Sequence, residues 1–241
     1  MKTIDIHAHV VPQSLWNAAD AKTEWYGYRH EPDAGLGTFV ANGARTAFNT
    51  AKVRFSPAER IKDMDAQGVD VQVLSIHTPF FGYHLDKVQG QSLARDVNAE
   101  IAATVKASPT RFAGLATLPM QDVSTAINEL EYAVTKLGLK GAELDTQVNG
   151  EQWDEKKFLP FFKAAEQMGA VLFFHPQPQN NFLRERNPRH GLFNSLGVIL
   201  DDWPFVPWTP GPGGWVQGLK SLSQEEKDRI LWKNLETLLN L

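Results

Sequence analysis

Three histidines end two stretches of strand-like sequence. His7 and His9 lie two residues apart near the start of the chain, and His175 closes the apolar run of residues 171–174. In an extended chain residues i and i+2 point to the same side, so the imidazoles of His7 and His9 project together. In a parallel barrel, the C-terminal ends of the strands gather at one rim. Because neutral imidazoles suit a single divalent metal ion, the pattern predicts that His7, His9 and His175 are metal ligands.

The histidine pair also has a simpler interpretation. H-x-H is a weak motif by itself: a solvent-facing pair on an antiparallel strand has the same sequence, and a single histidine after a strand is commonly hydrogen-bonded to backbone. Asp5 favours the metal site, because strict alternation places it on one face with His7 and His9, opposite an apolar face. Polar side chains in a row on the inner face of a barrel indicate a functional site.

One aspartate late in the chain is a candidate for catalysis. Asp202 precedes the sequence Trp-Pro-Phe at residues 203–205, as a carboxylate at a strand end would. It is predicted as a fourth metal ligand that also shuttles a proton to or from metal-bound water. Asp201 competes for this role, and a solvated aspartate in a turn is the structural alternative.

Five further residues are candidates for substrate binding. Arg45 and Arg54 lie in a long insertion, where a guanidinium group would clamp a carboxylate through two hydrogen bonds. His77 follows the second strand and would reach the same rim. Phe193 and Phe205 would line an aromatic pocket. Each has a plain alternative: a solvated surface arginine, a loop histidine without a role, or a core aromatic.

The elements around these residues predict a parallel sheet. Residues 3–9 read as a strand, and residues 10–55 as an irregular insertion. Ser56, Pro57 and Glu59 make a helix start with a capping box. From residue 69 to residue 175, four apolar strands are separated by single helices, which is typical of βαβ units. The continuous apolar run before His175 indicates a strand covered on both faces.

This alternation stops near residue 201. A Pro- and Gly-rich stretch follows, and a second capping box at residues 223–226 starts a last helix. A closed (β/α)8 barrel needs eight strands. The sequence therefore predicts one α/β barrel domain over residues 1–241, with an insertion at 10–55 and lacking about two strand–helix units near residue 201.

Composition excludes several classes of function. The 241 residues carry a net charge of -4 and no run of basic residues, which disfavours binding to nucleic acid or to an anionic membrane. The chain has no cysteine, so a metal site must use His, Asp or Glu. No apolar run is long enough to span a bilayer. We expect a cytoplasmic protein that acts on a small molecule.

Five stretches of the sequence together resemble one family. They are residues 1–12 (MKTIDIHAHVVP), 57–65 (PAERIKDMD), 111–120 (RFAGLATLPM), 173–176 (FFHP) and 202–205 (DWPF). They are similar to the aminocarboxymuconate-semialdehyde decarboxylase family (amidohydrolase-2) of the amidohydrolase superfamily. The resemblance implies a (β/α)8 TIM barrel, a homodimer, and loss of CO₂ from a small unsaturated or aromatic carboxylate. It also implies one divalent metal, zinc with manganese as the alternative, held by His7, His9, His175 and Asp202, and an arginine such as Arg45 on the substrate carboxylate.

The sequence departs from this family at one point. The family carries a His-Gly-Gly motif on its sixth strand, whose histidine acts as acid and base beside the metal-bound water, and no such motif occurs here. The motif would fall in the stretch that is missing near residue 201. Two alternatives to a decarboxylase therefore stay open: a metal-dependent hydrolase of a lactone, amide or ring C–N or C–O bond, and a truncated, non-catalytic barrel.

Overall fold

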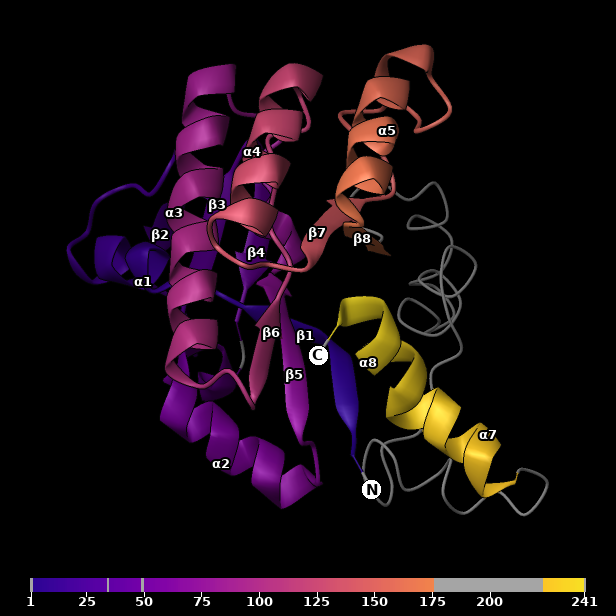
Figure 1. Cartoon of the computed structure of the whole chain (residues 1–241). Helices are drawn as coiled ribbons and strands as arrows, with labels where there is room; N and C mark the ends of the chain where they lie inside the picture. The colour runs from indigo at the N-terminus through magenta and orange to yellow at the C-terminus, as the bar shows by residue number, and fades with distance from the viewer. Residues whose placement is uncertain (1, 34, 49, 176–222, 241) are drawn as a thin grey trace, which may run out of the picture.

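Parallel strands form the centre of the fold. The computed structural model describes residues 2–33, 35–48, 50–175 and 223–240. Its parallel strands are β1 (Ile4–Val10), β5 (Val71–Ile76), β6 (Phe112–Gly114), β7 (Gly141–Asp145) and β8 (Val171–His175). β1, β5 and β6 pair in that order, β7 pairs with β8, and a parallel bridge between Ala116 and Ala142 joins the two groups (Figure 1). The predicted parallel arrangement is confirmed for these five strands.

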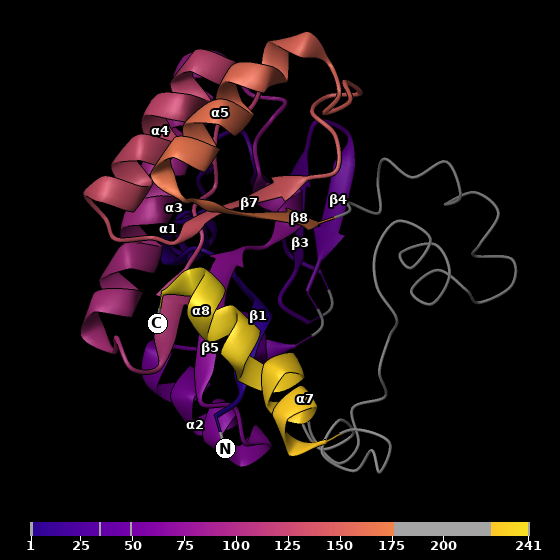
Figure 2. The same cartoon turned by 45° about the vertical axis from the view of Figure 1, so that its right-hand side comes forward.

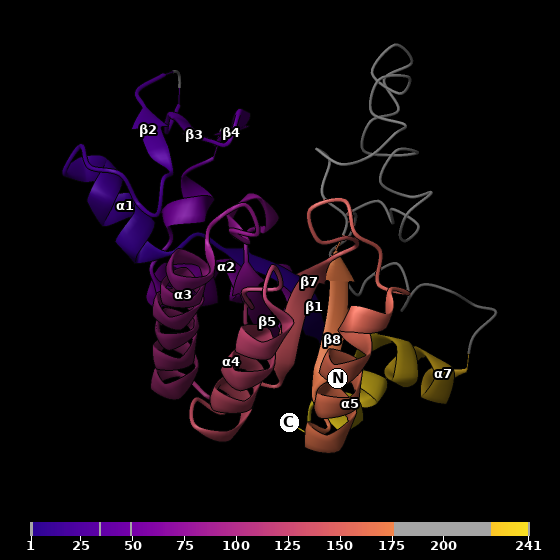
Figure 3. The same cartoon turned by 90° about the horizontal axis from the view of Figure 1, so that it is seen from above.

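A helix lies in each connection between consecutive parallel strands. Figures 1 and 3 show α3, α4 and α5 side by side along one side of the strands. This βαβ order is the one that the sequence predicted. The helices are α2 (Pro57–Gln67), α3 (Lys87–Ala107), α4 (Val123–Thr135) and α5 (Leu159–Met168), with short 3-10 turns η2 (Thr78–Phe80) and η3 (Lys156–Phe158).

Local side-chain chemistry explains where these helices begin and end. The Ser56 hydroxyl accepts from the Glu59 N–H, and the Glu59 carboxylate accepts from the Ser56 N–H, so the capping box before α2 is confirmed. Asp86 and Asp122 cap α3 and α4 in the same position. Gly68 ends α2 in the left-handed conformation, at a φ of 69°, which glycine adopts without steric cost.

The two faces of the parallel strands have different partners. The outer face packs under α3, α4 and α5; Leu74, Phe112 and Leu144 point into this core. The inner face packs against the C-terminal helical segment, where Leu239 is buried. Figure 2 shows α8 crossing in front of β1 and β5. The inner cluster comprises Ile4, Val71, Val73, Ala113, Leu115, Val171 and Leu239. The segment consists of α7 (Gln224–Asp228), the π-helical turn η8 (Arg229–Lys233) and α8 (Asn234–Leu239).

The insertion at residues 10–55 is ordered, so the prediction of irregular structure was wrong. Its three strands form an antiparallel sheet in the order β2, β3, β4. Asn42 and Gly43, both at positive φ, make the two-residue turn between β3 and β4, a sequence that favours hairpins. Trp16, Phe39 and Phe48 hold the insertion to the outer core. Its elements are α1 (Gln13–Asp20), β2 (Arg29–Glu31), β3 (Thr38–Ala41), β4 (Ala44–Ala47) and η1 (Ala51–Arg54).

The predicted barrel, which lacks about two strand–helix units near residue 201, stays a prediction. The described residues include five parallel strands, and the position near residue 201 falls in the range 176–222, outside the described residues. The second capping box is confirmed, since Ser223 and Glu226 exchange side-chain-to-backbone hydrogen bonds before α7. Within the described part of the chain, no helix is both long and apolar enough to cross a membrane.

Candidate metal centre

A bulge in β1 sets the direction of the two N-terminal histidines. Asp5 pairs with Gln72 and Ala8 with Leu74, so Ile6 and His7 together lie opposite one residue of β5. The bulge shifts the alternation by one position. His7 and His9 therefore turn to the inner face. Asp5 lies on the outer face with Gln72, so the prediction that Asp5 shares a face with the two histidines was wrong.

Three imidazoles converge at the C-terminal ends of β1 and β8. The Nε2 atom of His7 lies 3.0 Å from that of His9 and 2.8 Å from that of His175, and the last pair is 3.2 Å apart. The rings meet edge to face. In the described part of the chain, these three residues form a group whose donor atoms could all bind one ion.

Protons alone do not satisfy this triangle of nitrogens. The Nδ1 atom of His9 lies 3.2 Å from the Ile76 carbonyl oxygen, which places the His9 proton on Nδ1 and leaves a lone pair on Nε2. Each neutral imidazole has one ring proton, so His7 and His175 together supply two protons for the three contacts between Nε2 atoms. At least one contact therefore has no proton between its two nitrogens. At a zinc–nitrogen distance of about 2.0–2.1 Å, tetrahedral ligand nitrogens lie about 3.3 Å apart, close to the spacing here. The residues therefore fit a divalent cation.

Burial favours the neutral form of the His7 and His9 imidazoles. It lowers the pKa of His9 well below the ordinary value, and the neighbouring His175, His77 and His7 lower it further. Burial also lowers the pKa of His7, against a smaller opposing effect of Asp5. A neutral ring offers its lone pair to a metal, whereas a protonated ring does not. The electrostatics therefore favour ligation over a cluster of charged histidines.

A buried acid that the sequence did not single out lies beside the imidazoles. Glu143, on the inner face of β7, has no exposed surface, and its Oε1 lies 3.7 Å from the Nδ1 of His9. Burial raises the pKa of this carboxyl group to about 8, with a smaller opposing effect of Ser75. The signal in the sequence was a glutamate in the middle of an apolar strand, which becomes informative only when the inner face is known.

The structure also brings His77 to the cluster. Its ring lies 5.3 Å from that of His9 and 5.5 Å from Phe48. Burial first, then His175 and His7, lower its pKa to about 4. Its Nδ1 is buried without a hydrogen-bond partner among the described residues. This free ring nitrogen is compatible with the predicted substrate contact.

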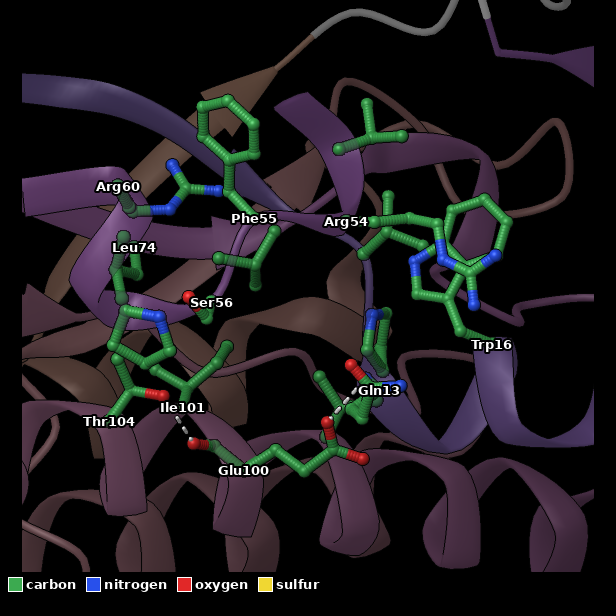
Figure 4. A pocket seen from close by; sticks show the side chains of 16 residues that line it. Gln13, Trp16, Arg54, Phe55, Ser56, Arg60, Leu74, Glu100, Ile101 and Thr104 are labelled. Carbon is green, nitrogen blue, oxygen red and sulfur yellow. Dashed lines mark hydrogen bonds between the residues drawn. The ribbon is translucent and has the colours of Figure 1, made fainter. Parts of the chain in front are cut away.

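The two arginines of the insertion have other partners. Arg45 on β4 forms an ion pair of 2.8 Å with Glu31. Arg54 forms an ion pair of 2.7 Å with Asp20 and lies over the ring of Trp16 (Figure 4). That region encloses a cavity of about 250 Å³ between α2, α3 and the insertion, and none of the three clustered histidines lines it. The substrate roles of both arginines stay predictions.

Three predicted site residues cannot be placed. Asp202, Phe193 and Phe205 lie outside the described residues, as does Asp201. The roles of Asp202 as ligand and proton shuttle, and of the two phenylalanines as pocket residues, therefore stay predictions.

Comparisons with known proteins show which family this chain belongs to. The chain is 33% identical over 195 residues to 2-amino-3-carboxymuconate-6-semialdehyde decarboxylase of Dictyostelium discoideum, covering 78% of this chain and 52% of that protein. The enzyme of the same name from Caenorhabditis elegans is 30% identical over 281 aligned positions, covering 98% and 66%. The crystal structure of 5-carboxyvanillate decarboxylase from Sphingomonas paucimobilis superposes with a TM-score of 0.61 at 28% identity, covering 82% of this chain and 58% of that one.

The chain spans about half the length of the Dictyostelium relative. The alignment with the C. elegans protein is longer than this chain of 241 residues, so part of that relative lies opposite gaps. The family model described as Amidohydrolase matches residues 4–190, which include β1, β8 and all three clustered histidines. This chain is a member of the amidohydrolase family.

Proposed function

We propose that this protein is a metal-dependent decarboxylase of a small unsaturated or aromatic carboxylate. The observation that carries the proposal is the convergence of three imidazole Nε2 atoms, 2.8–3.2 Å apart, at the C-terminal ends of two parallel strands. Relatives at 28–33% identity are named as decarboxylases of 2-amino-3-carboxymuconate 6-semialdehyde and of 5-carboxyvanillate. Both names describe unsaturated or aromatic carboxylates.

In this proposal His7, His9 and His175 hold the ion, and Asp202 completes its coordination. The donor set of three imidazoles and one carboxylate suits Zn²⁺, with Mn²⁺ as the alternative. A bound ion would supply Lewis acidity and a water of lowered pKa. His77 would contact the substrate through its free nitrogen.

We also propose that the five parallel strands are the first five of a (β/α)8 barrel. The absence of a His-Gly-Gly motif supports a missing stretch near residue 201, and the gaps opposite the C. elegans relative support a chain shorter than that relative. The domain would then cover residues 1–241, with the insertion at 10–55. By the same family resemblance, we expect a homodimer.

The test is metal binding by a ligand variant. We expect His175→Ala to lose stoichiometric zinc or manganese and all turnover while its circular dichroism stays unchanged. His84→Ala serves as the control, because this histidine contacts Tyr28 and lies outside the cluster. Full metal occupancy in His175→Ala would refute the ligand assignment. Wild-type protein that binds no stoichiometric metal would favour the non-catalytic alternative.

Product analysis separates the two enzymatic alternatives. Incubation with 2-amino-3-carboxymuconate 6-semialdehyde or 5-carboxyvanillate should release one CO₂ per molecule of substrate consumed. A lactone or amide incubated in isotope-labelled water would report a hydrolase instead, because hydrolysis places one solvent oxygen in the carboxylate product. Incorporation of that label without CO₂ release would overturn the decarboxylase proposal.

A further inference from the structure

A chain of polar contacts runs along the outer face of β1, behind the two histidines. Arg60 on α2 donates from Nη2 to the carbonyl oxygen of His9 at 3.0 Å and from Nη1 to the Oε1 of Gln72 at 3.2 Å. Gln72 donates to Asp5 at 3.1 Å, and the other Asp5 oxygen accepts from the backbone N–H of His7 at 3.1 Å. The chain therefore starts and ends on the backbone of the two candidate ligands.

These contacts start inside the bulge, at His7, and end just beyond it, at His9, which pairs regularly with Ser75. A bulge places an extra residue in one strand and leaves part of the hydrogen-bond ladder without its regular partners. Here the N–H of His7, inside the bulge, donates to the Asp5 carboxylate, and the C=O of His9, in the regularly paired stretch after the bulge, accepts from the Arg60 guanidinium. Both partners approach from the outer face, so they fix the backbone in the register that turns His7 and His9 to the inner face together.

We propose that Arg60 is a positioning residue for the metal centre, acting directly on the His9 carbonyl and through Gln72 and Asp5 on the His7 N–H. The proposal rests on the metal site proposed above. Arg60 has no direct contact with the ion; it holds the bulge that lets both imidazoles reach His175. Its planar guanidinium serves two acceptors at once, which a lysine ammonium on a flexible stem does less well.

The expected effect is a loss of metal affinity with the stoichiometry preserved. Removing groups that orient metal ligands typically weakens binding about 10–100-fold. We therefore expect Arg60→Met, which keeps the apolar stem and removes every donor, to bind Co²⁺ and Zn²⁺ in this range more weakly than the wild type. Arg60→Lys should recover part of the affinity, because the charge and an N–H donor group remain.

Arg111 provides a matched control. It also lies against the parallel strands and donates to two backbone carbonyls, of Val69 and Asp70, and to the carboxylate of Asp65. Those groups lie before the N-terminal end of β5, away from the histidines. Arg111→Met should lower the midpoint of thermal unfolding and leave the metal affinity unchanged.

In the experiment, metal-free wild type and variants are titrated with Co²⁺, and binding is measured from the visible absorption of the bound ion. The Zn²⁺ affinity is measured in competition with a chelator. Equal affinities for Arg60→Met, Arg111→Met and wild type would refute the positioning role. Wild-type protein that binds neither ion would refute the proposed function instead, so the two failures are distinct.

If Arg60→Met does not fold, Gln72→Leu replaces it. This variant keeps the bond from Arg60 to the His9 carbonyl but breaks the link to Asp5, so an unchanged affinity there would refute the part of the proposal that acts on His7 through Gln72 and Asp5.

Discussion

The buried acid Glu143 makes a strong prediction about stability and pH. Its side chain has no exposed surface on the inner face of β7, and burial raises its pKa from the ordinary 4.5 to about 8. Between these two values the folded chain keeps a proton that the unfolded chain releases. The free energy of unfolding of the metal-free protein therefore falls as pH rises through this window, because unfolding becomes easier when it releases a proton.

The magnitude follows from the width of the window. Each pH unit in which only the folded state is protonated costs up to about 1.4 kcal/mol. From pH 4.5 to about 8, Glu143 thus removes at most about 5 kcal/mol of stability. Glu143→Gln keeps the shape of the neutral acid and does not titrate. It should match the wild type near pH 5 and be several kcal/mol more stable at pH 8.5.

Urea unfolding of chelator-treated protein between pH 5 and pH 8.5 checks this prediction. The control is Glu129→Gln, since Glu129 is equally buried but bonded to Arg95 at 2.5 Å and to Asn98 at 2.9 Å. Losing this charge-assisted pair should destabilise the protein at every pH, by about 3 kcal/mol. If wild type and Glu143→Gln lose stability in parallel across the range, the buried proton on Glu143 does not exist.

Three further predictions concern the fold and the site. Gly141→Ala should lower the free energy of unfolding, measured with urea, by about 3 kcal/mol or more, because a Cβ there would overlap the backbone of β8. Gly138→Ala is the control: this residue also has a positive φ but lies in open space, so the loss should be about 1 kcal/mol. Leu239→Ala should cost about 3 kcal/mol in the same assay, since this side chain is 1% exposed in the inner cluster, and a neutral result would mean that α8 does not pack there in solution. Asp202→Asn should reduce turnover at least about tenfold more than Asp201→Asn in a steady-state assay; the opposite order would move the fourth ligand to Asp201.

Features that depend on a few adjacent residues were predictable from the sequence. The capping boxes at Ser56 and Ser223 were recognised because their bonds join residues three positions apart. The three histidines were grouped correctly because parallel strands end at a common rim, so position along the chain was enough to bring their side chains together. The hairpin at Asn42 and Gly43 had an equally local signal, which the high content of glycine and aromatic residues in the insertion obscured.

Features that depend on pairing between distant segments were not predictable. Nothing in residues 3–9 marks a bulge, because the extra residue exists only relative to β5. For this reason Asp5 was assigned to the wrong face. The partners of Arg45 and Arg54 were not predictable for the same reason. A long arginine side chain forms an ion pair with the carboxylate that the fold places near it, here Glu31 for Arg45 and Asp20 for Arg54.

The distance between His7 and His175 requires strong curvature of the parallel strands. These residues lie on the first and last of five neighbouring strands, which at a spacing of about 4.8 Å would be about 19 Å apart in a flat sheet. Two imidazole side chains cannot cover that distance, yet their Nε2 atoms are 2.8 Å apart. The strands must therefore bend around the inner face as the wall of a barrel does. A concave apolar face needs a cover, and α8 supplies it with Leu239. Loss of α8 packing would consequently let the strands flatten and draw the candidate ligands apart, which couples metal affinity to the packing of the C-terminal helix.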